Sequence, residues 1–234
     1  MPETTPLPVV IVACQVFEDL LEHLLPTDLA NQITFLDYGL HIVPKKLRLT
    51  VQAAIDRIDS PSLVVLGYGL CGNGLNGIKA GPHTLLIPRT DDCIAILLGS
   101  YQAYQREFHT APGTYWLSKG WLKSGTNPLA EYEKLVETYG EEDADWLMDQ
   151  QYRHYKRITL VAHNQADLDE FRPQAQKVAA YCARWGMSYH EMLGSEAYVR
   201  RLVEIAADLS LADDAFLVIP PGGELTQAQF MRGL

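Results

Sequence analysis

Short apolar runs rich in Val, Ile and Leu recur along this 234-residue chain, and segments with helical spacing of apolar residues separate them. The runs occupy residues 8–13, 33–41, 62–66, 83–88, 157–162 and 215–223, and a further short run, MSYHEML, lies at 187–193. Runs of this kind predict buried strands, and the spacing of Leu47, Val51 and Ile55 predicts an amphipathic helix between two of them. Strands that alternate with helices are typical of parallel βαβ units. We therefore expect an α/β protein with a Rossmann-like parallel sheet or sheets flanked by helices.

The alternation is interrupted in the middle of the chain, which predicts two α/β halves. The N-terminal half covers residues 1–120 and the C-terminal half covers 156–234. A helical insert, rich in acidic residues, joins them over 121–155. The pattern leaves open whether the two halves share one sheet, form two lobes or make one continuous domain.

The charge balance restricts the classes of partner. A formal net charge of −10 argues against binding of nucleic acid or of an anionic membrane through a general positive field. No apolar run approaches the roughly 20 residues of a membrane-spanning helix. The opening stretch, MPETTPLPVV, has no basic segment before its apolar run, so it does not resemble a signal peptide. We expect a cytoplasmic protein.

Three of the four cysteines follow the carboxyl end of a different predicted strand: Cys14, Cys71 and Cys93. In open α/β sheets this edge is where ligands bind. Three thiolates that meet at one point repel each other unless a cation neutralises them, so a metal ion or an iron–sulfur cluster is the natural occupant. Cys182 lies within a predicted amphipathic helix and is expected in the core. His83 is either a fourth ligand or a structural histidine.

The stretch GYGLCGNG, residues 67–74, contains the pattern GxGxxG of dinucleotide-binding turns around one of these cysteines. That fingerprint requires a helix directly after the turn. Here the ten residues after Gly72, NGLNGIKAGP, include three glycines and a proline, which do not support a regular helix. We therefore interpret the glycines as opening the backbone around Cys71 and a ligand. The loop residues expected to contact that ligand are Gly69, Gly72, Asn73 and Gly74.

Two further segments carry candidate ligand-binding residues. In PRTDDC, Arg89 would bind a carboxylate or phosphate, and Asp91 and Asp92 would serve as acid or base, orient the ligand or simply cap the following helix. That helix is predicted to run over 91–108 as one long element. In GTYWLSKGW, the rings of Tyr115 and Trp116 either wall a pocket or pack in the core.

Four blocks of sequence resemble the DUF1638 family of uncharacterised prokaryotic proteins: VACQVFEDLLE, LGYGLCGNGL, IPRTDDCIAILLGS and GTYWLSKGW. The resemblance extends over about residues 8–200. It implies that Cys14, Cys71 and Cys93 belong to the pattern of the family and that Cys182 does not. Members of the family are often encoded near corrinoid-dependent methyl-transfer systems, so the resemblance implies a methyltransferase or redox protein as a partner.

Together these features predict a cytoplasmic metalloprotein with a three-cysteine centre that takes a small-molecule ligand or substrate. A 4Fe–4S cluster with one open site is favoured, and zinc comes next. A link to corrinoid, methyl-transfer or redox metabolism and assembly into a homo-oligomer are also expected. Two alternatives stay open: a non-catalytic module that binds a small molecule or corrinoid, and a metal-free enzyme with Cys71 or Cys93 as nucleophile.

Overall fold

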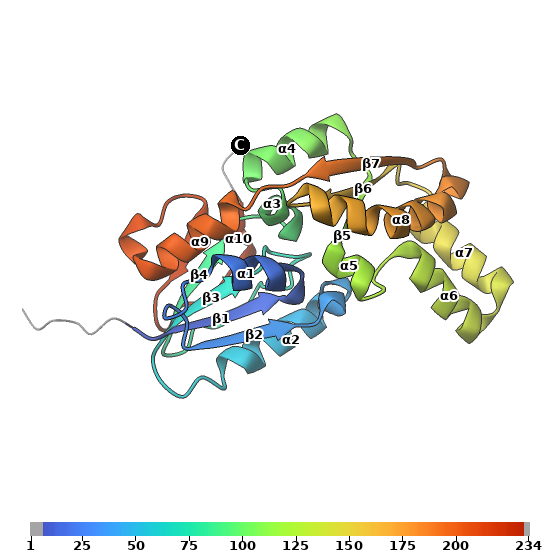
Figure 1. Ribbon diagram of the computed structural model, residues 1–234. Helices are drawn as coiled ribbons and strands as arrows, with labels where there is room; N and C mark the ends of the chain where they lie inside the picture. The colour runs from blue at the N-terminus through green and yellow to red at the C-terminus, as the bar shows by residue number, and fades with distance from the viewer. Residues whose placement is uncertain (1–6, 232–234) are drawn as a thin grey trace, which may run out of the picture. The chain divides into compact units, whose positions relative to one another are not determined.

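The computed structural model describes residues 7–231, and the strands within that range form two sheets (Figure 1). Residues 1–6 and 232–234 lie outside the described part. The first six residues of MPETTPLPVV, the stretch that does not resemble a signal peptide, are therefore outside it too. The first sheet has the strand order β2-β1-β3-β4-β8 and the second has the order β5-β6-β7. Among the described helices, none combines the length and the apolar character needed to cross a bilayer. The predicted α/β class, with largely parallel sheets flanked by helices, is confirmed.

The first sheet is parallel except at one edge. Its strands are β1 (Val9–Cys14), β2 (Gln32–Leu36), β3 (Leu63–Gly67), β4 (Thr84–Pro88) and β8 (Phe216–Ile219). Strand β1 pairs in parallel with β2 and β3, and β3 pairs in parallel with β4, whereas β8 runs antiparallel to β4. The central strands β1 and β3 are buried along their whole length, as expected for apolar strands covered on both faces. The first four strands therefore end at one common edge.

Helices cover both faces of this sheet. They are α1 (Glu18–Leu24), α2 (Pro44–Ile55), α3 (Cys93–Leu97), α9 (Ala197–Ala207) and α10 (Gln227–Phe230), with short 3-10 turns η1 (Gln15–Phe17), η2 (Tyr38–Ile42) and η4 (Leu209–Leu211). Helix α2 packs on β1 and β2, while α9 packs on β4 and on α1 (Figure 1). The predicted apolar face of α2 is confirmed, because Leu47, Val51 and Ile55 are all buried.

The second sheet is parallel throughout, with β5 (Thr114–Ser118), β6 (Arg157–Ala162) and β7 (Ser188–Leu193). Its helices are α4 (Tyr101–Thr110), α5 (Lys119–Lys123), α6 (Pro128–Tyr139), α7 (Glu141–Tyr152) and α8 (Gln165–Cys182), followed by the 3-10 turn η3 (Ala183–Trp185). Helix α8 packs on β6 and β7 and also on α6, which pairs with α7. The core of this region contains Cys182, which is fully buried among apolar side chains as predicted.

The chain divides into two compact units whose boundaries differ from the predicted ones. The first unit contains the residues up to Ile96 and those from Glu196 on, and the second unit is Leu97–Ser195. The predicted boundaries at 120/121 and 155/156 must be corrected because β5 pairs with β6, in the second sheet, and β8 returns to β4, in the first. The predicted insert is not separate, since α6 and α7 contribute to the core of the second unit.

Two predicted elements are shorter than expected. The strand predicted over 33–41 ends at Leu36, because Asp37 accepts a hydrogen bond from the amide of Gly39 and starts a 3-10 turn. The helix predicted over 91–108 is interrupted between α3 and α4. Gly99 has a positive φ of 86° there, and the Ser100 hydroxyl caps the new helix.

Candidate functional site

The three cysteines predicted to form a centre lie at the carboxyl edge of the first sheet. Cys14 is the last residue of β1, Cys71 lies in the loop after β3, and Cys93 is the first residue of α3, shortly after β4. All three side chains are buried, with exposures of 5%, 6% and 8%. Parallel pairing of the three strands brings their carboxyl ends together, as the sequence analysis expected.

The thiols contact one another through Cys93. The Sγ atoms of Cys71 and Cys93 are 3.5 Å apart, and Cys93 is also the hydrogen-bonding partner of Cys14. The Cys14 sulfur additionally accepts a hydrogen bond from the backbone of Val16, at the start of η1. Within residues 7–231, no group of three His, Cys, Asp or Glu side chains stands in a ready-made metal-binding arrangement. The site is thus a set of contacts centred on Cys93.

Backbone hydrogen bonds hold the two cysteine loops against each other. The amide of Leu70 donates to the carbonyl of Thr90 (2.9 Å), and the amide of Cys71 donates to the carbonyl of Asp91 (2.8 Å). A Cβ atom on Gly69 would lie only 2.7–2.8 Å from the backbone of Asp92. Gly69 therefore serves the site by allowing this close approach, which any larger residue would prevent.

The backbone around Cys71 makes an unusual turn. Cys71, Gly72 and Asn73 have consecutive positive φ angles of 47°, 61° and 69°. Two of these residues carry a Cβ, and such a residue pays about 1 kcal/mol or more to adopt the left-handed region. The turn is closed by a hydrogen bond from the Gly74 amide to the Cys71 carbonyl (3.0 Å). At Gly74 a Cβ would lie 2.5 Å from Leu47, so this glycine lets the turn pack on α2.

The contacts between the thiols shift the pKa values of Cys14 and Cys93 in opposite directions. The Cys93 thiol donates to Cys14 and lowers the pKa of Cys14 below its ordinary value. The pKa of Cys93 is raised well above its ordinary value by hydrogen bonding with Cys14 and Cys71 and by burial. Cys14 is consequently the first of this pair to ionise and Cys93 the last. The carboxylate of Asp37 adds negative potential at Cys14.

Two buried hydroxyl groups on the same loops have no hydrogen-bond partner among the described residues. The Tyr68 side chain is 2% exposed and the Thr90 side chain is 1% exposed. Burial, followed by the charges of Cys14, Cys93 and Cys71, raises the pKa of Tyr68 far above its ordinary value, so its hydroxyl stays protonated and can donate. An unsatisfied buried hydroxyl costs about 1–3 kcal/mol and calls for an explanation.

The sequence analysis did not select Tyr68, Thr90 or Asp37 as site residues. A signal was present for Tyr68, which stands between two glycines of the GYGLCGNG stretch and one residue beyond β3. Asp37 directly follows β2 and thus lies at the same edge of the sheet as the cysteines. The rule that selected the cysteines, position after a parallel strand, would also have selected both of these residues.

The family model described as "Protein of unknown function (DUF1638)" matches residues 35–203, which is more than half of the chain. The chain belongs to the DUF1638 family. The matched range includes Cys71 and Cys93, while Cys14 lies before it. Neither a curated protein nor a solved structure matches the chain.

In this DUF1638 protein the charged residues of the PRTDDC segment have structural partners. The Arg89 guanidinium donates to the carbonyl of Met231 (2.7 Å). The Asp92 carboxylate accepts from the amide of Ile94 (2.8 Å) and so supports the start of α3, which was the structural alternative for these acids. Asp91 contributes its backbone carbonyl to the contact between the loops.

The remaining candidates belong to other parts of the fold. His83 precedes β4 at its amino end, whereas the cysteines lie at the carboxyl ends. Burial lowers the pKa of His83, and its Nδ1 has no partner among the described residues. Tyr115 and Trp116 belong to the second unit, where Tyr115 packs edge-on against Tyr152 and Trp116 lies beneath the guanidinium of Arg157.

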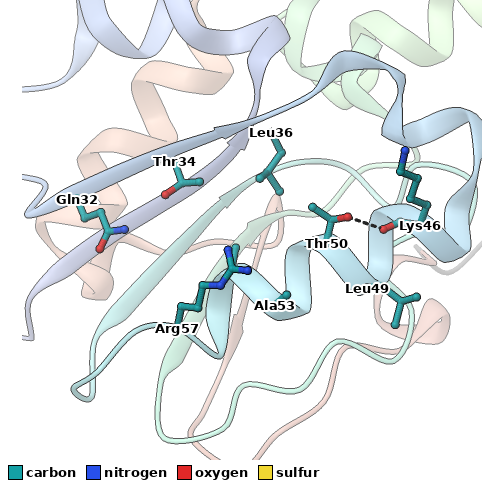
Figure 2. A pocket seen from close by; sticks show the side chains of 9 residues that line it. Gln32, Thr34, Leu36, Lys46, Leu49, Thr50, Ala53 and Arg57 are labelled. Carbon is teal, nitrogen blue, oxygen red and sulfur yellow. Dashed lines mark hydrogen bonds between the residues drawn. The ribbon is translucent and has the colours of Figure 1, made fainter.

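The first unit also has a surface hollow of about 390 Å³ between β2 and α2 (Figure 2). Its lining consists of Gln32, Thr34, Leu36, Lys46, Leu49, Thr50, Ala53, Ala54 and Arg57. Strand β2 contributes alternate residues and α2 contributes one face, with Lys46 near the start of the helix and Arg57 beyond its end. The cysteines and the other predicted site residues are not part of this lining.

Proposed function

We propose that this DUF1638 protein is a cytoplasmic metalloprotein in which Cys14, Cys71 and Cys93 hold one metal centre that takes a small-molecule ligand. The observation that carries the proposal is the contact of both Cys14 and Cys71 with Cys93 at the carboxyl edge of a parallel sheet. Thiolates are ligands that zinc and iron–sulfur clusters prefer. The donor set therefore fits such a centre.

The charges around the thiols favour a metal over a free nucleophile. A nucleophilic cysteine is activated by a neighbouring His, Lys or Arg, or by a helix N-terminus. Cys93 begins the short helix α3, but its pKa is raised rather than lowered. The charged groups that bear most on Cys14 and Cys93 are the other thiols and Asp37, which are all negative when ionised. A bound cation would supply the missing positive charge and allow all three thiols to ionise together.

The contact geometry bears on which metal the thiols would hold. Two thiolates on one tetrahedral zinc lie ~3.8 Å apart, since each Zn–S bond is about 2.3 Å long. The 3.5 Å between Cys71 and Cys93 is close to that spacing. In a 4Fe–4S cluster each cysteine binds a different iron, so the sulfurs must stand farther apart. This contact favours a single ion such as zinc and makes the cluster the second choice.

The residues of the chain would bind the centre and shield it. Cys14, Cys71 and Cys93 supply three ligands, and the buried loops exclude bulk water from them. When bound, such a centre supplies Lewis acidity or an electron at its remaining position. A role beside a methyltransferase or redox partner is part of the proposal and agrees with the genomic association of the family described above.

Metal analysis of anaerobically purified protein tests the proposal. We expect about one zinc per chain and a colourless protein, or about four iron ions with sulfide and a brown protein. Cys14→Ser, Cys71→Ser and Cys93→Ser should each reduce the metal content at least about tenfold. Cys182→Ala is the matched control, because this cysteine is equally buried but lies in the apolar core of the second unit.

Two results would contradict the metal centre. One is wild-type protein that contains no stoichiometric metal after purification and cannot be loaded with zinc or with iron and sulfide. The other is metal that is lost in Cys182→Ala and retained in the three serine variants. Ligand-induced stabilisation that survives replacement of all three cysteines would instead support a metal-free binding module. Inactivation by alkylation of one cysteine alone would support a thiol enzyme.

A further inference from the structure

Tyr68 lies at the candidate centre, on the loop that carries Cys71. It follows β3 directly, three residues before Cys71, and its side chain is 2% exposed. The charges of Cys14, Cys93 and Cys71 all act on its hydroxyl. The hydroxyl is thus buried and lies within electrostatic range of all three cysteines.

The hydroxyl of Tyr68 has no hydrogen-bond acceptor among the described residues. Among residues 7–231 no oxygen, nitrogen or sulfur atom accepts a hydrogen bond from Tyr68. Thr90, which precedes Cys93 on the adjoining loop, has a second buried hydroxyl without a partner. Buried polar side chains in native proteins are nearly always satisfied, and the exceptions often face a ligand or ordered water. An acceptor that is not part of the chain would complete both groups.

We infer that Tyr68 donates a hydrogen bond to an oxygen atom of the molecule that binds at the three-cysteine centre. This inference rests on the proposed metal centre and specifies its ligand. The ligand belongs to the class of small molecules that carry a carboxylate or a comparable oxygen acceptor, which binds the open position of the metal. Tyr68 is then a ligand-binding residue. It favours ligands that present an oxygen atom as a hydrogen-bond acceptor over ligands that have no acceptor at this place.

Binding of acetate to metal-loaded wild type and Tyr68→Phe tests the inference, with imidazole as the reference probe. Acetate offers an oxygen acceptor beside the metal, whereas imidazole binds the metal through nitrogen. Cobalt substituted for zinc reports both titrations by its visible spectrum, and the spin-resonance signal of the reduced cluster reports them in an iron–sulfur form. Tyr68→Phe should weaken acetate about tenfold or more and change imidazole by less than about twofold.

A measurement on the metal-free protein separates this role from a structural one. Because the hydroxyl has no partner in the chain, Tyr68→Phe should leave the urea midpoint of metal-free protein unchanged or raise it. A hydroxyl that served the fold would give a lower midpoint. Thr90→Val, which keeps the shape of the side chain, should likewise leave the midpoint unchanged or raise it.

Each result decides between the two proposals. Equal acetate affinity in wild type and Tyr68→Phe, or no acetate binding by the loaded wild type, would overturn the inference and leave the metal centre intact. Failure of Tyr68→Phe to fold or to load metal would also overturn it, since the hydroxyl would then serve the fold or the metal itself. Wild-type protein that binds no metal would refute the metal centre instead.

Discussion

The two parallel sheets of this protein use their carboxyl edges differently. At the edge of the second sheet, polar side chains serve the helices that follow. Ser118 accepts from the amide of Trp121 at the start of α5, and Asn164 accepts from the amide of Asp167 at the start of α8 (2.8 Å). These side chains are typical helix caps, and their hydrogen-bonding capacity is used within the unit.

At the edge of the first sheet, Asp37 and Asp92 also accept hydrogen bonds from the amides of Gly39 and Ile94, but the cysteines beside them have no such role. Cys14 ends β1 and precedes η1, and its side chain makes no capping hydrogen bond. The thiols contact one another, and the hydroxyls of Tyr68 and Thr90 have no partner among the described residues. The difference teaches that these polar side chains of the second edge are used within the fold, while the first edge holds buried thiols and hydroxyls without such a role, and the two proposals above depend on these groups.

Removal of metal should affect the first edge alone, and this is the largest effect that we expect. In metal-loaded protein treated with a chelator, amides in the loops around residues 68–76 and 90–94 should exchange hydrogen about tenfold faster or more. Amides at residues 119–123 and 165–168, which follow the second edge, should keep their exchange rates. Exchange that changes equally at both edges would show that the two edges are not functionally different.

The close approach of the cysteine loops should make Gly69 sensitive to substitution. In Gly69→Ala the new Cβ would lie 2.7–2.8 Å from the backbone of Asp92. We expect a loss of about 2–3 kcal/mol in the free energy of unfolding, measured with urea. Gly140→Ala is the control, because no atom lies within 4 Å of its new Cβ and only its φ of 84° opposes the change. That control should cost about 1 kcal/mol, and equal losses would contradict the packing argument.

The sequence was sufficient to predict that the three cysteines lie close together, but not how the chain divides into units. Parallel strands share an edge, so the position of Cys14, Cys71 and Cys93 after three such strands was enough to bring them together. Periodicity reports only local structure, so it did not reveal that β8 returns to β4 or that β5 joins the second sheet. Tyr68 and Thr90 stand out in the structure because their buried hydroxyls have no hydrogen-bond partner among the described residues, and no sequence pattern encodes such an absence.

Loss of a cap at the second edge should lower stability without affecting the candidate centre. In Asn164→Ala, helix α8 loses the acceptor for the amide of Asp167, which should cost about 1 kcal/mol in the free energy of unfolding. Metal content should equal that of the wild type. Gln176→Ala, at an exposed position of α8, is expected to change the free energy by less than about 0.5 kcal/mol. A loss of metal in Asn164→Ala would contradict the assignment of separate roles to the two edges.

The smallest effect concerns the cysteine that is not at either edge. Burial raises the pKa of Cys182 to about 12 from an ordinary value of 9.0. In the unfolded chain this thiol ionises at the lower pKa, so the stability that it contributes is complete below pH 9 and is lost as the pH rises toward 12. At about pH 9.5 the wild type should therefore have lost about 0.8 kcal/mol of its advantage over Cys182→Ala, measured by urea unfolding of metal-free, reduced protein. An advantage that stays constant between about pH 7.5 and 9.5 would mean that the Cys182 thiol ionises as readily in the folded chain as in the unfolded one.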